Sequence, residues 1–256
     1  MVAIAENSPA MFRKIQNGVP SLLNLIIGLM LEVEDHKEWA NTKDFTSIEI
    51  TNSDVGSESL DRVSRSLTGQ TVFPFLIKAL PQLLTNKTSW SHRYTGHQIL
   101  CIMGDTCEEQ LKKQLGGALQ MIMQGCGDEN PRVRYAACNT LGQFCSDFRP
   151  ALQREFPEQV VSSIINLMKD PVPKIQAHAA SCVVNFCEEV KAKYVEKWVD
   201  SFMQLLLNIL QGGKLMVQEE ALTAIASLAL TVQKSFSNFF FLFNIFILIF
   251  IIHFVC

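Results

Sequence analysis

The sequence lacks the short motifs that mark most enzyme active sites. It has no Cys-x-x-Cys pair, no glycine-rich loop followed by Lys-Ser or Lys-Thr, and no Gly-x-Ser-x-Gly. His97 and Cys101 are four residues apart and could share a helix face, but further ligands at zinc spacing are missing. We therefore expect no catalytic residue, no cofactor and no metal site.

The sequence also lacks a strong excess of charge and a secretory leader. Its net charge of −3 is too small to favour direct binding of nucleic acid, which requires a basic surface. Most of the eight cysteines stand among Ala, Leu, Val and Phe, where free thiols behave as small buried apolar groups. No basic segment followed by an apolar core opens the chain. These features favour a reduced, intracellular protein.

What the sequence does contain is an internal repeat. The stretch that begins at Asp128 recurs 42 residues later from Asp170, with Pro131 matched by Pro173. The same register continues in both directions along the chain. A period of roughly 40 to 47 residues with helical spacing is typical of HEAT and armadillo units. The predicted fold is therefore all-α: a HEAT-repeat α-solenoid, a right-handed superhelical array of which this chain holds a part.

Four segments follow from this repeat. Residues 1–31 are predicted to be the remnant of a repeat, with its second helix at 18–31, and 32–58 an acidic inter-helix loop. Residues 59–235 hold tandem repeats, and 236–256 form an apolar tail. Each helix pair is too small to bury its own apolar face, so we expect the chain to be a piece of a longer array. The predicted repeats lie at about 59–85, 89–125, 131–169 and 173–211, with only a first helix at 217–233.

The tail departs from the repeat pattern. Residues 239–256 form an apolar run in which only Asn244 and His253 are polar. This run is just long enough for a transmembrane helix. The Phe and Ile content fits translated non-coding sequence, such as a retained intron, equally well. Both interpretations stay open, and any membrane contact would have to pass through residues 239–256.

Several segments together resemble the importin-β (karyopherin-β) nuclear transport receptors, especially the importin-5 (karyopherin β3) branch. They are Asp128 to Asn139, Lys174 to Ala180 followed by Asn185-Phe, Glu38-Trp-Ala-Asn41 and Glu58-Ser-Leu-Asp-Arg62. The resemblance covers residues 18–235. The order of acidic loop, Leu-Asp-Arg helix and regular repeats is similar to a central part of that family.

The resemblance implies a nuclear import receptor that shuttles between cytoplasm and nucleus through nuclear pores. It implies three kinds of partner: cargo with basic nuclear-localisation signals, Phe-Gly nucleoporins and Ran-GTP. The repeats that make most of the family's Ran contact are not in this chain, and the loop is less acidic than usual. Alternatives are a HEAT scaffold that organises a protein complex and a membrane-tethered adaptor.

Candidate cargo-binding residues come from the helices taken as second in each pair, which line the concave face of HEAT arrays. Carboxylates there could bind Lys or Arg, amides could bond an extended backbone, and an indole could offer a cation–π surface. The candidates are Glu155, Glu158, Asn166, Glu196, Trp198, Asp200 and Asn208. The acidic loop contributes Glu32, Glu34, Asp35 and Glu38.

Overall fold

The computed structural model describes residues 1–36, 39–41, 50–212 and 214–232, and their regular structure is helical. The first α-helices are α1 (Val2–Asn7), α2 (Pro9–Phe12), α3 (Gly18–Met30), α4 (Asn52–Leu67), α5 (Gly69–Leu84), α6 (Trp90–Thr106), α7 (Glu108–Leu111) and α8 (Leu115–Cys126). They are followed by α9 (Pro131–Asp147), α10 (Ala151–Glu155), α11 (Pro157–Leu167), α12 (Pro173–Cys187), α13 (Val199–Gly212) and α14 (Leu215–Thr231). Short 3₁₀ segments are η1 (Trp39–Asn41), η2 (Lys112–Gln114), η3 (Ala192–Tyr194) and η4 (Glu196–Trp198).

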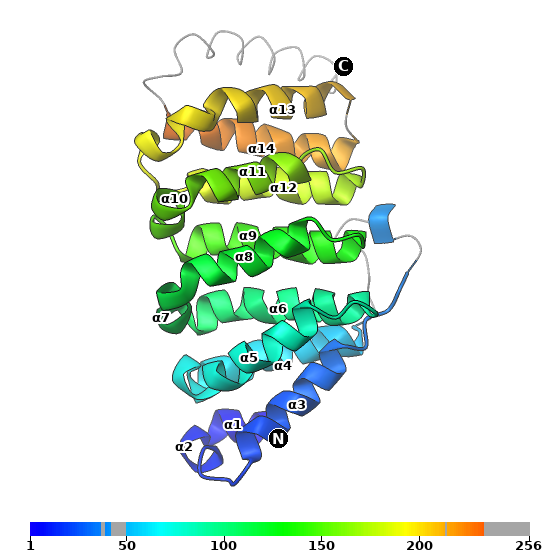
Figure 1. Cartoon of the computed structure of the whole chain (residues 1–256), viewed down its shortest axis with the longest axis vertical. Coiled ribbons are helices and arrows are strands. Elements are labelled where there is room, and N and C mark those ends of the chain that lie inside the picture. The colour runs from blue at the N-terminus through cyan, green and yellow to red at the C-terminus, as the bar shows by residue number, and fades with distance from the viewer. Residues whose placement is uncertain (37–38, 42–49, 213, 233–256) are drawn as a thin grey trace.

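The helices stack in two layers along the long axis of the molecule (Figure 1). The front layer holds α5, α8, α11 and α13, and the rear layer holds α4, α6, α9, α12 and α14. Along the rear layer α6 packs on α9, α9 on α12 and α12 on α14, and each front helix packs on the rear helix that follows it. The prediction of an all-α stacked array is confirmed for the described residues.

The core of the stack is made of apolar side chains from neighbouring helices. Leu100, Leu141 and Val183, which occupy equivalent positions in successive repeats, are fully buried. The seven described cysteines are free thiols, and all four in α9 and α12 are buried. The apolar faces that one helix pair cannot cover are covered by its neighbours, as expected for a repeat array.

Arginine–aspartate bridges join one repeat to the next. In α6, Arg93 donates to both carboxylate oxygens of Asp128, at 2.6 and 2.8 Å. Arg134 of α9 makes the same pair of bonds to Asp170, at 2.6 and 3.1 Å. Such two-pronged bonds fix the relative position of the groups. The sequence echo at Asp128 and Asp170 thus reports a contact that sets the spacing of the stack.

The predicted loop over 32–58 is wrong at its carboxy-terminal end, because α4 begins at Asn52. Thr51 caps this helix: its hydroxyl accepts from the Asp54 amide at 3.2 Å, and the Asp54 carboxylate accepts from the Thr51 amide at 3.0 Å. Asp54 and Glu58, two of the acidic residues that suggested a solvated loop, thus belong to a capping box and to the exposed face of a helix. The repeat predicted to begin at 59 consequently has a helix that starts seven residues earlier.

Within three of the predicted repeats, the second half holds more than one helical segment. The segment Glu108–Met123 contains α7, η2 and most of α8, and Leu152–Lys169 is split between α10 and α11 at Pro157. Tyr194–Leu210 begins with η3 and η4 before α13. Pro157 is the first residue of α11, where its missing amide proton costs nothing, and it restricts the preceding residue. Helical spacing alone did not reveal these breaks.

Two glycines of α8 provide a test of the packing. A Cβ at Gly125 would overlap Nε2 of the buried His97 and lie 2.8 Å from Cβ of Ala137, whereas a Cβ at Gly117 has no atom within 4 Å. We expect Gly125→Ala to destabilise the protein by about 1–3 kcal/mol through overpacking. Gly117→Ala should stabilise it by about 0.5–1 kcal/mol, because glycine is a poor helix former. Urea unfolding of both variants checks this, and equal midpoints would contradict it.

The inter-repeat bridges can be tested in the same way. Arg134→Ala leaves the carboxylate of Asp170, only 6% exposed, without its cation. Breaking a buried pair from one side costs about 3 kcal/mol or more. The matched control is Arg62→Ala, whose pair with Glu6 is open to solvent and should shift the urea midpoint little. Similar shifts for the two variants would show that the bridges do not hold the repeats together.

Candidate peptide-binding surface

The predicted cargo-binding residues all lie in the front half of the stack or in the turns that lead into it. Glu155, Glu158, Asn166, Glu196, Asp200 and Asn208 are exposed, and Trp198 is half-buried. They come from α10, α11, η4 and α13. The surface they share is polar and accessible, but no contact in the structure tests whether it binds a peptide, so the assignment stays a prediction.

Several of these side chains already have partners within the chain. Glu155 pairs with Arg154 at 2.6 Å, and Glu158 pairs with Lys197. The Lys197 ammonium also lies 4.7 Å from the centre of the Trp198 ring. The cation–π surface predicted for Trp198 therefore exists, and a neighbouring lysine occupies it.

Asn166 and Asn208 belong to a longer column of amides. Each lies 42 residues after the previous amide in the series Gln82, Gln124, Asn166 and Asn208. All four side chains are exposed. Sequence reasoning missed the two glutamines, although stepping back by the 42-residue period from Asn166 leads directly to them.

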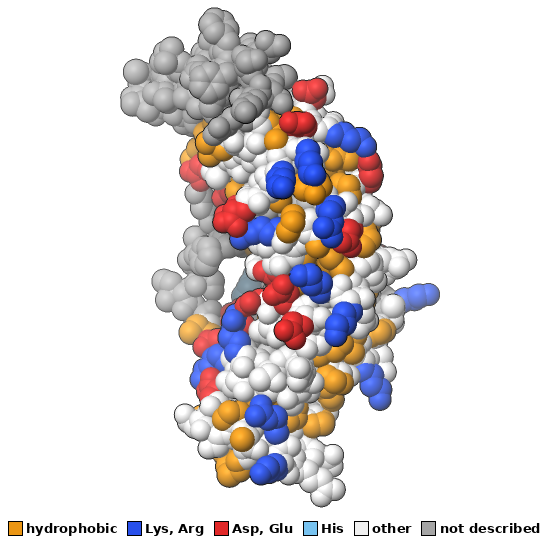
Figure 2. Space-filling model, turned by 90° about the vertical axis from the view of Figure 1, so that its left-hand side faces the viewer, with side chains coloured by type: hydrophobic (Ala, Val, Ile, Leu, Met, Phe, Trp, Pro, Cys, Tyr) orange, Lys and Arg blue, Asp and Glu red, His pale blue; other side chains and the backbone are white. Residues whose placement is uncertain are grey.

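A different set of carboxylates marks the rear layer, near the carboxy-terminal ends of its helices. Asp105 of α6, Asp147 of α9 and Glu188, the residue after α12, stand at helix ends, and Asp61 lies in the second half of α4, so each of these helices contributes one carboxylate. They lie along the edge that carries α7 and α10 in Figure 1, and Figure 2 shows basic and acidic side chains interspersed along it. Sequence reasoning did not select this row.

Arginines occupy part of this row. Arg65 pairs with Asp61 at 2.9 Å and also with Asp105, and Arg149 pairs with Glu188 at 2.8 Å. Asp105 and Glu188 remain about half exposed. An incoming lysine or arginine could replace these surface pairs at little cost, since exposed ion pairs are weak.

Asp147 is the exception in the row. Its Oδ1 accepts a hydrogen bond from Gln143 at 2.7 Å, but its buried Oδ2 receives none from the described residues. A Cβ at Gly104 would lie 2.7 Å from this Oδ2, so the carboxylate sits close against the backbone of α6. Burial raises the pKa of Asp147 to about 6, and the nearby Asp105 and Glu108 carboxylates add to the rise while the Gln143 bond opposes it. A carboxylate held in this way favours a cation beside it.

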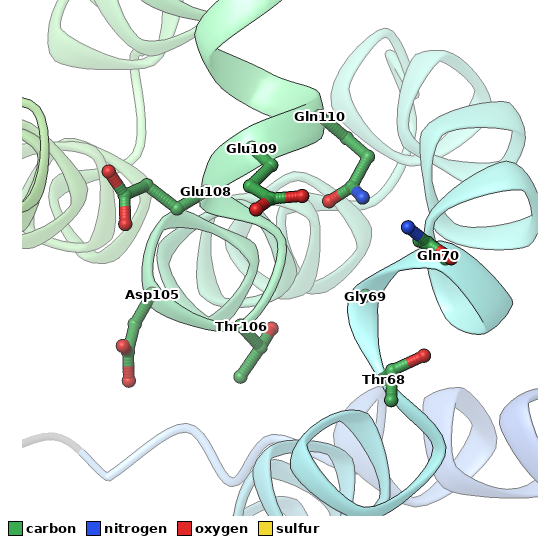
Figure 3. Close-up of a pocket in the computed structure, with 8 residues that line it drawn as sticks. All are labelled: Thr68, Gly69, Gln70, Asp105, Thr106, Glu108, Glu109 and Gln110. Carbon is green, nitrogen blue, oxygen red and sulfur yellow. The ribbon is translucent and has the colours of Figure 1, made fainter.

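An open pocket of about 410 Å³ adjoins the row at Asp105. It lies between the α4–α5 and α6–α7 junctions, and Figure 3 shows Gln70 facing Gln110 across it. The carboxylates of Asp105, Glu108 and Glu109 belong to its lining, which includes no basic side chain. This chemistry suits the end of a lysine or arginine side chain.

The predicted acidic loop is used for contacts within the chain. Glu32 accepts a bond from Asn52 at 2.7 Å, Glu34 pairs with His36 at 2.7 Å, and Asp35 pairs with Arg132 at 3.0 Å. Glu38 lies outside the described residues, as does the apolar tail from 236 to 256. In the part of the chain that is described, no helix is long and apolar enough to cross a bilayer. The same residues contain no cluster of His, Cys, Asp and Glu with the arrangement of a metal site.

Two protein families match the sequence. A family described as "Importin repeat" matches residues 1–74, and the HEAT repeat family matches residues 118–148. The HEAT match takes in most of α8 together with α9, whereas the repeat predicted over 131–169 places α9 with α10 and α11. In this match α8 is the first helix of the HEAT unit and α9 is the second. By the repeat period, α6 and α12 are the second helices of the neighbouring units.

The chain is similar to yeast importins over nearly its whole length. It is 32% identical over 245 residues to importin subunit beta-3 of Saccharomyces cerevisiae, and the matched region covers 94% of this chain and 22% of that protein. A crystal structure of the karyopherin Kap121p bound to the SUMO protease Ulp1p has a TM-score of 0.90 and 30% identity, over 96% of this chain and 24% of the other. A Kap121p variant in which two aspartates and one glutamate are replaced by lysine has a TM-score of 0.88 and 31% identity, over 93% and 24%. The chain thus spans about a quarter or less of these relatives.

Proposed function

Because the chain belongs to the importin-β family, in the branch of importin subunit beta-3, we propose that it is part of a nuclear import receptor. The resemblance on which this identification began is confirmed by these matches. The receptor binds cargo segments rich in lysine and arginine, acts by reversible binding rather than as an enzyme, and shuttles between cytoplasm and nucleus. Phe-Gly nucleoporins and Ran-GTP are further proposed partners. Structures of Kap121p with RanGTP and with Nup53p support this set of partners.

The observation that carries the proposal is the row of carboxylates on the rear layer. The helices α4, α6 and α9 each contribute one carboxylate, and Glu188 follows α12, so the row repeats with the period of the stack. An extended peptide with several basic side chains can place one of them at each site, which multiplies weak contacts along the array. The change of three acidic residues to lysine in a Kap121p variant supports a role for carboxylates in that relative.

Asp147 is the position that we assign the strongest contact. Its buried Oδ2 has no hydrogen-bond donor among the described residues, so a cation held beside the half-buried carboxylate would offset charge that the fold leaves uncompensated. The neighbouring carboxylate of Asp105 and the acidic pocket beside it would take the charged end of a second lysine or arginine side chain. Hydrogen bonds between charged groups are about twice as strong as neutral ones.

The front-layer residues predicted from the sequence remain a second proposed surface for the same basic segments. Glu155, Glu158 and Asp200 are exposed there, and the amides of Asn166 and Asn208 could bond a peptide backbone. The two surfaces use side chains from different helices, although Glu155 of α10 lies at the same edge of the stack as the carboxylate row, so substitutions on one leave the side chains of the other unchanged. That separation allows a direct comparison.

Two matched triple variants distinguish the surfaces. Asp105→Asn/Asp147→Asn/Glu188→Gln changes the rear row, and Glu155→Gln/Glu158→Gln/Asp200→Asn makes the same charge change on the front. With a rhodamine-labelled lysine- and arginine-rich peptide, fluorescence anisotropy should give a Kd at least about tenfold weaker for the rear variant, equivalent to about 1.4 kcal/mol. The front variant should stay within about twofold of the unchanged protein.

The outcomes of this comparison separate the alternatives. Loss of binding in the front variant alone would move the site to the residues predicted from sequence. Equal affinity for all three proteins would overturn a carboxylate-based site. Circular dichroism and the thermal midpoint of each variant show that any loss is not caused by unfolding.

Peptide binding should also depend on pH through Asp147. Its pKa of about 6 in the free protein means that the carboxyl gains a proton as the pH falls through 6, and the neutral form attracts a cation weakly. We therefore expect affinity for a histidine-free basic peptide to fall between pH 7.5 and 5.5. The Asp147→Asn variant should bind weakly and show a much flatter profile. A pH-independent Kd in the unchanged protein would contradict this role.

A further inference from the structure

A short segment between α3 and α4 lies against the opposite edge of the rear layer. We call it the strap: residues 35–36 and 39–41. Figure 1 shows its η1 turn beside the ends of α9 and α12. It contacts two cations there. The Nη2 of Arg132 donates to the His36 carbonyl at 2.8 Å and pairs with Asp35, and the Lys174 Nζ lies 3.4 Å from the Trp39 carbonyl.

The indole of Trp39 is enclosed by the same cations and by an aromatic ring. The Arg132 guanidinium and the Lys174 ammonium each lie 5.0 Å from its ring centre, and Tyr135 meets it edge to face at 5.3 Å. Arg132 also lies 5.4 Å from the ring of Trp90 on α6. The strap thus fits a niche built by three successive rear helices.

This niche is unusually positive. Arg132 and Lys174 are only 7% and 5% exposed, and each is the second residue of its helix, after Pro131 and Pro173. The amino-terminal end of a helix already carries a partial positive charge, so cations there are unfavourable unless something compensates them. The described residues of the strap supply compensation through the Asp35 carboxylate, the His36 and Trp39 carbonyls and the face of the Trp39 indole.

The contacts define a recognition chemistry. A segment that places a carboxylate about four residues before a tryptophan satisfies both cations, as Asp35 and Trp39 do. Cation–π contacts and charged hydrogen bonds each gain strength where water is excluded. The strap is tethered at both ends, so its effective concentration at the niche is high, on the order of millimolar.

We propose that the Arg132–Lys174 niche is a binding site for an acidic, tryptophan-containing peptide segment, with the strap as its built-in occupant. A partner segment of this chemistry binds by displacing the strap. The site is distinct from the carboxylate row, which lies at the other edge of the layer and takes segments of opposite charge. It therefore does not depend on the function proposed above.

The test uses the full chain and a synthetic labelled peptide with the sequence of residues 32–42. In the variant Asp35→Ala/Trp39→Ala the strap loses its carboxylate and its indole and keeps only the two backbone carbonyl contacts, so it competes for the niche more weakly. We expect this variant to bind the peptide at least about tenfold more tightly than the unchanged protein, in which the tethered strap competes. Fluorescence anisotropy gives both Kd values.

The control is placed on the peptide, which avoids changing buried residues of the protein. A second peptide carries the same two alanine changes and should not bind this variant. The proposal is overturned if the first peptide binds both proteins equally, if it binds neither, or if the altered peptide binds as well as the original.

Discussion

The contact between one repeat and the next is the constraint on which the rest of this structure depends. No helix pair here can bury its own apolar face, so α6, α9, α12 and α14 pack in a continuous series. The bridges from Arg93 to Asp128 and from Arg134 to Asp170 fix the register of that series. Because every repeat is placed by its neighbour, side chains at equivalent positions fall into lines along the surface. The carboxylate row and the amide column are both consequences of this register.

The two edges of the rear layer have opposite chemistry. At the carboxy-terminal ends of the helices stand Asp61, Asp105, Asp147 and Glu188, partly compensated by arginines. At the amino-terminal ends stand Arg132 and Lys174, compensated by the strap. At both edges, charged groups proposed to bind a partner are paired with side chains of opposite charge from the same chain. Apart from Asp147, these charged groups would therefore bind a partner by exchanging an internal contact for one with the partner.

The repeat, the all-α class and the family resemblance could be predicted because they rest on residues that recur at a fixed interval, such as Pro131 and Pro173. The start of α4 could not, because the capping pair Thr51 and Asp54 has the composition of a loop. The rear carboxylate row was missed because the predicted repeats made α9 the first helix of its pair, whereas the HEAT match makes it the second. The candidate residues were therefore chosen from the front layer. The strap could not be predicted at all: Trp39 meets Lys174 across 135 residues of sequence, and no local pattern encodes that contact.

If basic peptides bind along the rear carboxylate row, hydrogen–deuterium exchange with and without a lysine- and arginine-rich peptide will show where they lie. We expect slower exchange at the end of α6 through α7 and around the end of α9, where Asp105 and Asp147 stand. Slower exchange confined to α10, α11 and the start of α13, with no change around Asp147, would contradict it.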